Sequence, residues 1–192
     1  DNLKGTILNQ EITKNSLTAN QKKKLKLLLK THSSNEGDYK DVEILQSLLK
    51  AIEIQTSYEI NDSREDYFRL NAQEIGWLKR FPENLWVEYL IYRYKLRLYP
   101  KNRVLLDFPP YILIEPTSIC NLRCVMCFQV DRSFTKKEHM GMMSWDIFTK
   151  IVDEAALNNC KAITLASRGE PTLHPKLPEM IEYISKKKIL DL

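Results

Sequence analysis

The chain has 192 residues, of which 43% are hydrophobic and 28% are charged, and its formal net charge is +4. This balance is typical of a soluble globular protein and excludes a disordered or collagen-like chain. Basic and acidic residues occur throughout, so the charge does not indicate a nucleic-acid surface. No apolar stretch reaches the roughly 18 to 20 residues that span a bilayer, and the first residues lack the apolar core of a signal peptide. We therefore expect a cytoplasmic protein that binds neither membrane nor nucleic acid.

The first part of the chain is predicted to be helical, because apolar residues recur in it at three- and four-residue spacing. One such series extends from Val42 to Ile52. Before it, residues 31–38 contain serine, asparagine and glycine and predict a loop. After it, Asn71 is a candidate helix cap, and Glu74 lies three residues later in the position that completes a capping box.

A further helix is predicted over residues 83–99, because Pro82 suits a first helical turn and Pro100 ends the pattern. Its aromatic residues could form a platform for bases or sugars, but aromatic residues at helical spacing are more often part of a core. The basic series from Lys22 to Lys30 could bind a membrane surface or RNA, or could form an ordinary solvated helix face. Together these segments predict an all-α N-terminal region over residues 1–107.

A second domain is predicted over residues 108–192, because Phe108, Pro109 and Pro110 interrupt regular pairing and the pattern then changes. The expected elements are a strand over 111–115, a helix capped by Ser144 that continues to residue 158, a strand over 162–166, a helix from Pro178 to Lys188 and a strand from Ile189. This alternation predicts a parallel sheet. Loops that follow parallel strands emerge at one edge of the sheet, where active sites of such folds lie.

The loop after the first predicted strand contains Cys120, Cys124 and Cys127 in CxxxCxxC spacing. Clustered cysteines in a cytoplasmic protein are typical of metal ligands or redox centres. Three thiolates on one short loop can bind three irons of a cubane cluster and leave the fourth iron open. The same cysteines could instead hold a structural zinc ion, with His139 or Cys160 as the fourth ligand. Cys160 precedes a buried strand, however, and is expected to be a core thiol.

The loop after the second predicted strand contains Gly169, Glu170 and Pro171. Gly169 leaves room for a ligand beside the backbone, and Pro171 stiffens the turn. Glu170 offers a carboxylate to an ammonium group. His174 in the same loop is expected to be a turn residue rather than an acid or base. Because the strands are predicted to be parallel, this loop is expected to lie beside the cysteine loop.

The CxxxCxxC spacing after one strand, with Gly-Glu-Pro after the next, resembles the radical S-adenosylmethionine (radical SAM) superfamily. The segment Cys-Asn-Leu-Arg-Cys-Val-Met-Cys is most similar to its SPASM-associated members. The resemblance covers residues 108–192. It implies an α/β fold in which these residues are the first β/α units of a partial TIM-like (β/α)6 barrel, preceded by the all-α region. The start at Asp1 and the apolar alternation at the end lead us to expect a fragment of a longer protein.

The resemblance implies a 4Fe-4S cluster held by three ligands, whose open iron binds S-adenosylmethionine. The implied ligands are Cys120, Cys124 and Cys127. The implied cofactor contacts come from Gly169, Glu170 and Pro171, from the backbone of Met126, and from Arg168, which stands where many relatives have a second glycine.

The implied activity is radical chemistry. An external one-electron reductant, flavodoxin-like or ferredoxin-like, is expected to supply the electron that cleaves S-adenosylmethionine to methionine and a 5'-deoxyadenosyl radical, which abstracts hydrogen from a substrate. Peptide or protein modification and small-molecule chemistry are both open. The alternative is a non-catalytic iron-sulfur or zinc-binding module, although a pure electron carrier normally has four cysteine ligands.

Overall fold

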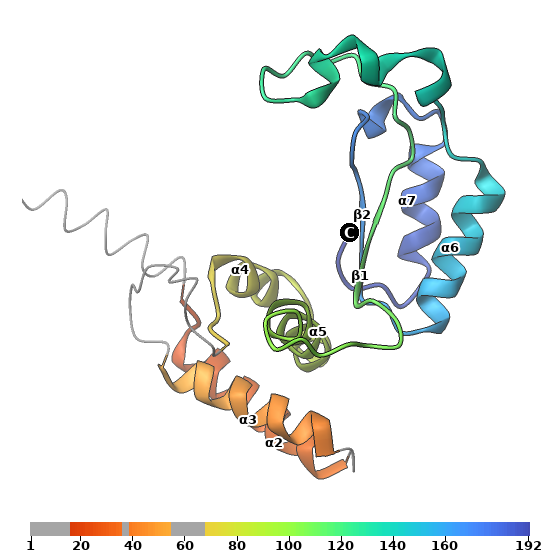
Figure 1. Ribbon diagram of the computed structural model, residues 1–192. Helices are drawn as coiled ribbons and strands as arrows, with labels where there is room; N and C mark the ends of the chain where they lie inside the picture. The colour runs from red at the N-terminus through yellow and green to blue at the C-terminus, as the bar shows by residue number, and fades with distance from the viewer. Residues whose placement is uncertain (1–15, 36–38, 55–67) are drawn as a thin grey trace, which may run out of the picture. The chain divides into compact units, whose positions relative to one another are not determined.

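The computed structural model describes residues 16–35, 39–54 and 68–192 (Figure 1). The chain divides into two compact units, Asp1–Leu105 and Leu106–Leu192, and this division lies close to the predicted boundary at residues 107 and 108. The described part of the first unit is helical, whereas the second unit combines helices with a parallel sheet. Among the described residues, no helix has the length and apolar character needed to cross a membrane.

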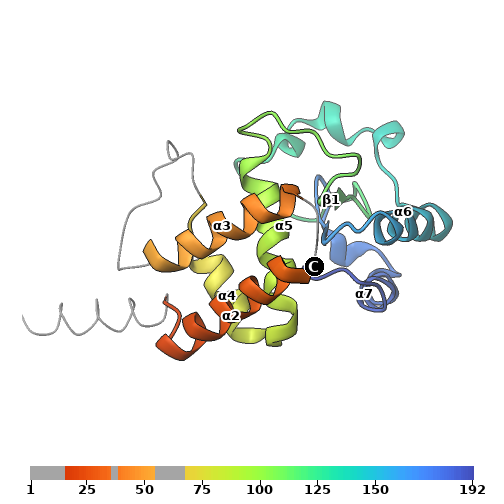
Figure 2. The ribbon, with the colours of Figure 1, turned by 90° about the horizontal axis from the view of Figure 1, so that it is seen from below.

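The first unit is built from α-helices that pack on one another. They are α2 (Ala19–Asn35), α3 (Tyr39–Ile54), α4 (Ala72–Arg80) and α5 (Trp86–Leu98), with a 3-10 turn, η1 (Glu83–Leu85), before α5. Helices α2 and α3 contact each other, and both contact α5 (Figure 2). Trp77 of α4 stacks on Tyr89 of α5 with ring centroids 3.8 Å apart. Because Trp86, Tyr89, Tyr92 and Tyr94 are buried, the prediction that these aromatic residues form a core is confirmed.

The predicted capping box is present at the start of α4. The Asn71 side chain accepts hydrogen bonds from the backbone amides of Gln73 and Glu74, and a Glu74 carboxylate oxygen accepts from the Asn71 amide at 2.9 Å. The buried Glu74 carboxylate also pairs with the Arg93 guanidinium of α5 at 2.8 Å. One acidic side chain therefore both begins α4 and fixes it against α5, since a buried charge requires such a partner.

One local prediction in this unit was wrong. Helix α2 continues to Asn35 through most of the loop predicted over residues 31–38, and residues 36–38 lie outside the described part of the chain. Serine and asparagine cost a helix less than about 1 kcal/mol each, which an already formed helix can absorb. The helical stretch predicted over residues 83–99 is confirmed, because η1 begins directly after Pro82 and continues into α5 at Trp86.

The second unit contains a two-stranded parallel sheet with two helices on one face (Figure 1). Strands β1 (Tyr111–Ile114) and β2 (Ala162–Leu165) pair with Tyr111 opposite Ala162. The helices are α6 (Trp145–Leu157), whose predicted cap Ser144 accepts a hydrogen bond from the Ile147 amide, and α7 (Leu177–Ser185). Their apolar faces enclose a core with the sheet, formed by Ile114, Phe148, Val152, Ala155, Cys160, Ile163, Met180 and Ile184.

The sheet is less extensive than the sequence predicts. The segment after Ile189 forms only an isolated parallel bridge, between Ala162 and Asp191, in place of a third strand. Strand β1 is buried on one face only, and the Leu113 side chain on the other face is 51% exposed. This open parallel sheet is compatible with the first β/α units of a larger α/β fold, and the closed barrel stays a prediction.

Candidate functional site

The two loops singled out in the sequence lie side by side at the carboxyl ends of β1 and β2. The Glu170 amide of the second loop donates a hydrogen bond to the Ile119 carbonyl, one residue before the first cysteine, at 2.9 Å. Loops that follow parallel strands emerge at the same edge of the sheet. The parallel pairing of β1 with β2 therefore explains why these two loops are in contact. The prediction that the two loops lie together is confirmed.

Gly169 is the point of closest approach between these loops. A Cβ atom added there would lie 2.0 Å from the Thr117 carbonyl oxygen and 2.8 Å from that of Ile119. The sequence interpretation left this space for a ligand, but the backbone between β1 and the cysteines fills it. Only glycine allows such a backbone contact. Gly169 therefore positions the cysteine loop, and its contact with a cofactor stays a prediction.

The three predicted cluster ligands lie on an irregular loop. Cys124 and Cys127 are the first and last residues of a tight turn. The Cys127 amide donates to the Cys124 carbonyl at 2.9 Å, so their Cα atoms are as close as in a β-turn. All three thiols are free, with Cys124 exposed and Cys120 and Cys127 partly exposed. Met126, inside this turn, is 84% exposed.

These thiols suit an iron-sulfur cluster by their chemistry, although they do not yet converge. Within residues 16–35, 39–54 and 68–192, no three histidine, cysteine or acidic side chains lie close enough together to hold a metal ion. The three thiols are accessible and lie on an irregular loop, so no helix or strand fixes the distances between them. Thiolates are the ligands that iron-sulfur clusters require. Binding a cluster therefore requires a local adjustment of this loop.

Of the two residues proposed as a fourth zinc ligand, Cys160 lies away from the cysteine loop. The Cys160 thiol is 1% exposed, donates to the Ala162 carbonyl at 3.3 Å and belongs to the core at the amino end of β2, opposite the cysteine loop. Its burial raises the pKa of the thiol, which opposes the thiolate form that metals bind. His139 is exposed on the 3-10 turn η4 (Lys137–His139). The prediction that Cys160 is a core thiol is confirmed.

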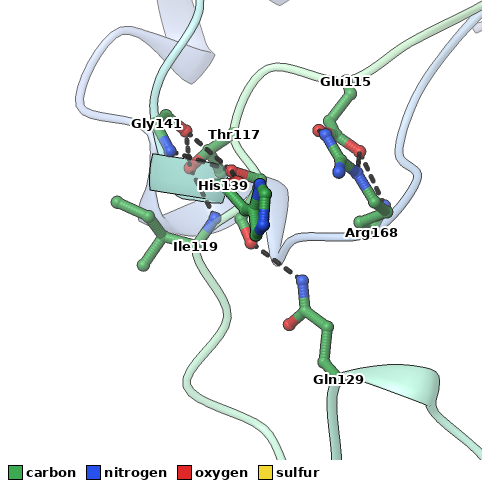
Figure 3. Close-up of polar contacts among 8 residues, drawn as sticks. Glu115, Thr117, Ile119, Gln129, His139, Gly141 and Arg168 are labelled. Carbon is green, nitrogen blue, oxygen red and sulfur yellow. Dashed lines mark hydrogen bonds and ion pairs between the residues drawn. The ribbon is translucent and has the colours of Figure 1, made fainter. Parts of the chain in front are cut away.

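A hydrogen-bond network that the sequence interpretation missed surrounds the start of the cysteine loop (Figure 3). The Thr117 and Ser118 hydroxyls donate to backbone carbonyls of the segment 139–141, and the Gly141 amide donates to the Ser118 hydroxyl at 2.9 Å. Gln129, after the last cysteine, donates to the Ser118 carbonyl. These side chains carried no periodic signal, and only the position of Thr117 and Ser118 between a strand and the cysteines could have indicated them.

Arg168 is paired with Glu115, the residue that follows β1. Its Nε and Nη2 atoms donate to both carboxylate oxygens at 2.6–3.1 Å, and its backbone amide donates to Oε2 at 3.0 Å (Figure 3). These hydrogen bonds hold the pKa of Glu115 below its usual range. The ion pair joins the ends of β1 and β2, and a contact of Arg168 with a cofactor carboxylate stays a prediction.

Replacing Glu115 with glutamine should lower the melting temperature by roughly a few degrees at neutral pH, because a half-exposed ion pair contributes modestly. Since the folded-state pKa is lowered, this stabilisation is complete above the ordinary glutamate value of 4.5 and disappears as the pH falls through the folded-state value. Thermal unfolding of both proteins between pH 7 and pH 3 tests this. A difference that grows as the pH falls would contradict it.

Glu170 and Pro171 begin the 3-10 turn η5 (Pro171–Leu173). Glu170 Oε1 accepts from the Thr172 hydroxyl at 2.6 Å and from the Thr172 amide at 3.2 Å. The Thr172 hydrogen bonds lower the pKa of Glu170, so the carboxylate is ionised at neutral pH. A cation that approaches this loop therefore meets a fixed negative charge.

His174 has a structural role, as predicted. It is 5% exposed, its Nδ1 accepts from the Lys176 amide at 3.1 Å, and its Nε2 lies 3.1 Å from the Met143 carbonyl. A ring nitrogen that accepts is unprotonated, so Nε2 carries the proton and donates to Met143. These two contacts fix the loop after β2 to the segment before α6 and leave neither ring nitrogen for a substrate.

Comparison with known proteins shows which class of protein this part of the chain resembles. The family model for the Radical SAM superfamily matches residues 114–192, so this part of the chain is similar to a radical SAM domain. Members of this superfamily use a 4Fe-4S cluster and S-adenosylmethionine. The match includes both loops described above. The SPASM-associated type was not found among these comparisons and stays a prediction.

Three relatives illustrate the similarity. The tungsten-containing aldehyde ferredoxin oxidoreductase cofactor-modifying protein of Pyrococcus furiosus is 38% identical over 78 residues, which are 40% of this chain and 21% of the relative. The probable GTP 3',8-cyclase of Methanococcus maripaludis is 38% identical over 76 residues, 40% of this chain and 24% of the relative. The GTP 3',8-cyclase of Clostridium botulinum is 33% identical over 76 residues, 40% of this chain and 23% of the relative. The chain thus spans less than a quarter of these relatives, and no solved structure matches it.

Proposed function

We propose that this protein cleaves S-adenosylmethionine reductively at a 4Fe-4S cluster and uses the resulting radical to abstract hydrogen from a substrate. The observation that carries the proposal is the direct contact between the two loops, through the hydrogen bond from Glu170 to Ile119 and the backbone packing at Gly169. A metal site alone requires only the cysteine loop. Because the glycine-glutamate-proline loop is fixed against the cysteine loop, the Glu170 carboxylate is available to a cofactor bound at the cluster, and this supports a combined site for cluster and cofactor.

The cysteines and Glu170 have the main proposed tasks. Cys120, Cys124 and Cys127 hold the cluster, and three thiolates leave one iron open for the cofactor. Glu170 binds the ammonium group of the cofactor through Oε2, because within the described chain both of its side-chain hydrogen bonds use Oε1. Its lowered pKa keeps it in the charged state that this contact needs.

Two further residues contribute weaker contacts. The backbone of Met126 reaches the adenine, since the exposed turn at this position leaves its peptide groups accessible. Arg168 binds the cofactor carboxylate through Nη1, because Glu115 occupies its Nε and Nη2 atoms. Pro171 fixes the direction in which the loop leaves Glu170.

The bound cluster and cofactor supply the one-electron cleavage to methionine and a 5'-deoxyadenosyl radical. We propose that an external flavodoxin-like or ferredoxin-like reductant delivers the electron near the cysteine loop. A hollow of about 790 Å³ beside this loop is lined by Arg123, Val125, Gln129, Val130, Arg132 and Thr135. Its two arginines and the 92% exposed Val125 complement an acidic carrier with an apolar contact area.

The substrate remains open between a peptide or protein and a small molecule. The names of the relatives point to different targets, since one modifies a cofactor and the others cyclise GTP. The shared segment contains the loops that start the radical reaction, so the similarity supports this initiating step and not a particular target. A cytoplasmic location belongs to the same proposal, because reduced clusters require a reducing compartment.

Anaerobic reconstitution with iron and sulfide, followed by dithionite and S-adenosylmethionine, tests the proposed function. The expected product is 5'-deoxyadenosine, measured by chromatography, and omitting dithionite should abolish it. Replacing Glu170 with glutamine should raise the cofactor concentration needed for half-maximal product, because a neutral amide binds an ammonium group less well than a carboxylate. A reconstituted cluster that yields no 5'-deoxyadenosine would support the electron-transfer alternative instead.

A further inference from the structure

Gln129 is a buried polar residue to which the proposed chemistry gives no task. Its side chain is 8% exposed, and its Nε2 atom donates a hydrogen bond to the Ser118 carbonyl at 2.9 Å (Figure 3). Ser118 precedes Cys120 by two residues, and Gln129 follows Cys127 by two residues. The bond therefore joins the two ends of the segment that contains all three cysteines.

Ser118 is also held by hydrogen bonds to the segment that contains His139 and Gly141. Its amide donates to the Gly141 carbonyl at 3.0 Å, and its hydroxyl donates to the His139 carbonyl at 3.1 Å while it accepts from the Gly141 amide at 2.9 Å. Ser118 is 5% exposed. Backbone and side-chain groups of one residue thus fix the start of the cysteine loop, so the bond from Gln129 attaches the far end of the loop to a rigid point.

We infer that Gln129 is a positioning residue that closes the cysteine loop on Ser118 before any cluster binds. A closed loop samples fewer arrangements than an open one, so three thiols on it meet one cluster at a lower entropic cost. The loop leaves its thiols accessible and without a fixed common centre. The hydrogen bond from Gln129 limits the conformations of the cysteine loop and leaves all three thiols available to a cluster. The link to the cluster rests on the proposed function, whereas the closure of the loop does not.

Trypsin provides a direct measure of loop closure, because cleavage requires the chain to open locally. Arg123 lies inside the closed loop, and Arg132 lies just outside it. Replacing Gln129 with methionine keeps the length of the side chain and removes the donor. We expect cleavage after Arg123 in the cluster-free protein to become about five-fold faster, the effect of losing one typical hydrogen bond, with cleavage after Arg132 unchanged.

The matched control is Gln46→Met, the same chemical change on the exposed surface of α3, which should alter neither cleavage rate. A second variant, Ser118→Ala, removes the hydroxyl that holds Ser118 to His139 and Gly141 and should also accelerate cleavage after Arg123 selectively. Thermal unfolding of each variant establishes that it is folded. Unchanged cleavage after Arg123 in folded Gln129→Met would overturn the inference, as would an equal acceleration at Arg123 and Arg132.

The link to the cluster has its own readout. After anaerobic reconstitution, iron release to a chelator should be about five-fold faster from Gln129→Met than from the wild-type protein, with the Gln46→Met rate unchanged. Equal release rates, together with faster cleavage after Arg123, would overturn the positioning role. If the wild-type protein binds no cluster, the proposed function fails, and the cleavage rates still decide whether Gln129 closes the loop.

Discussion

Replacing Cys124 with serine is expected to abolish stable cluster binding, and the same result is expected for Cys120 and Cys127. Three thiolates are the fewest that can hold a cubane cluster with one open iron, so no spare ligand exists on this loop. Loss of an outer-shell partner of a metal ligand already costs about 10–100-fold in affinity, and loss of a ligand itself should cost more. Iron and sulfide content after anaerobic reconstitution, with the visible absorption of the cluster, measures the effect.

Cys160→Ala is the matched control for these variants. The Cys160 thiol is buried in the core and separated from the other cysteines by the length of β2, so its removal should leave iron content unchanged. It should lower stability only slightly, because alanine retains most of the apolar packing of a small thiol. Loss of the cluster from Cys160→Ala alone would contradict the assignment of three ligands.

Replacing Gly169 with alanine is expected to separate the two loops. The new Cβ atom would lie 2.0 Å from the Thr117 carbonyl oxygen, a backbone atom that cannot rotate away. Forcing atoms into a filled space costs about 1–3 kcal/mol and sometimes more. For a unit of this size, the melting temperature should fall by roughly 4–8 °C for each kcal/mol. The amide of Glu170, which bonds to Ile119, should also exchange its hydrogen faster.

Gly141→Ala provides the control for this prediction. Gly141 belongs to the same edge of the second unit, but a Cβ atom added there meets no atom within 4 Å. Its stability should change by less than about 0.5 kcal/mol. Similar destabilisation by both alanines, measured by thermal unfolding, would show that glycine flexibility rather than the contact at Gly169 explains the effect.

The sequence predicted those elements whose signals are local. The capping pairs at Asn71 and Ser144, and the apolar series along α3 and α6, depend on residues three or four positions apart, so the structure reproduces them. The position of the two functional loops also followed from the order of strands and helices. The ends of helices were less predictable, because a helix that has already formed can continue through residues that favour a loop. The extension of α2 to Asn35 is an example.

The contacts that organise the site could not be predicted, because they join residues far apart in the chain. The pair Glu115–Arg168 and the bond from Gln129 to Ser118 depend on the register of β1 with β2 and on the path of the loop. The interpretation of Gly169 illustrates the same limit. Its need for space was correctly inferred, but whether a ligand or the chain fills that space depends on tertiary structure.

The network around Ser118 also has a consequence for how this protein can diverge. Gln129 and Gly141 both bond to Ser118, so the chain between them leaves and returns at nearly the same place. The intervening residues form short 3-10 turns and are mostly exposed. Loop closure depends only weakly on length, so insertions within residues 131–138 should be tolerated. This stretch can therefore change in length without displacing the two ends that are held at Ser118.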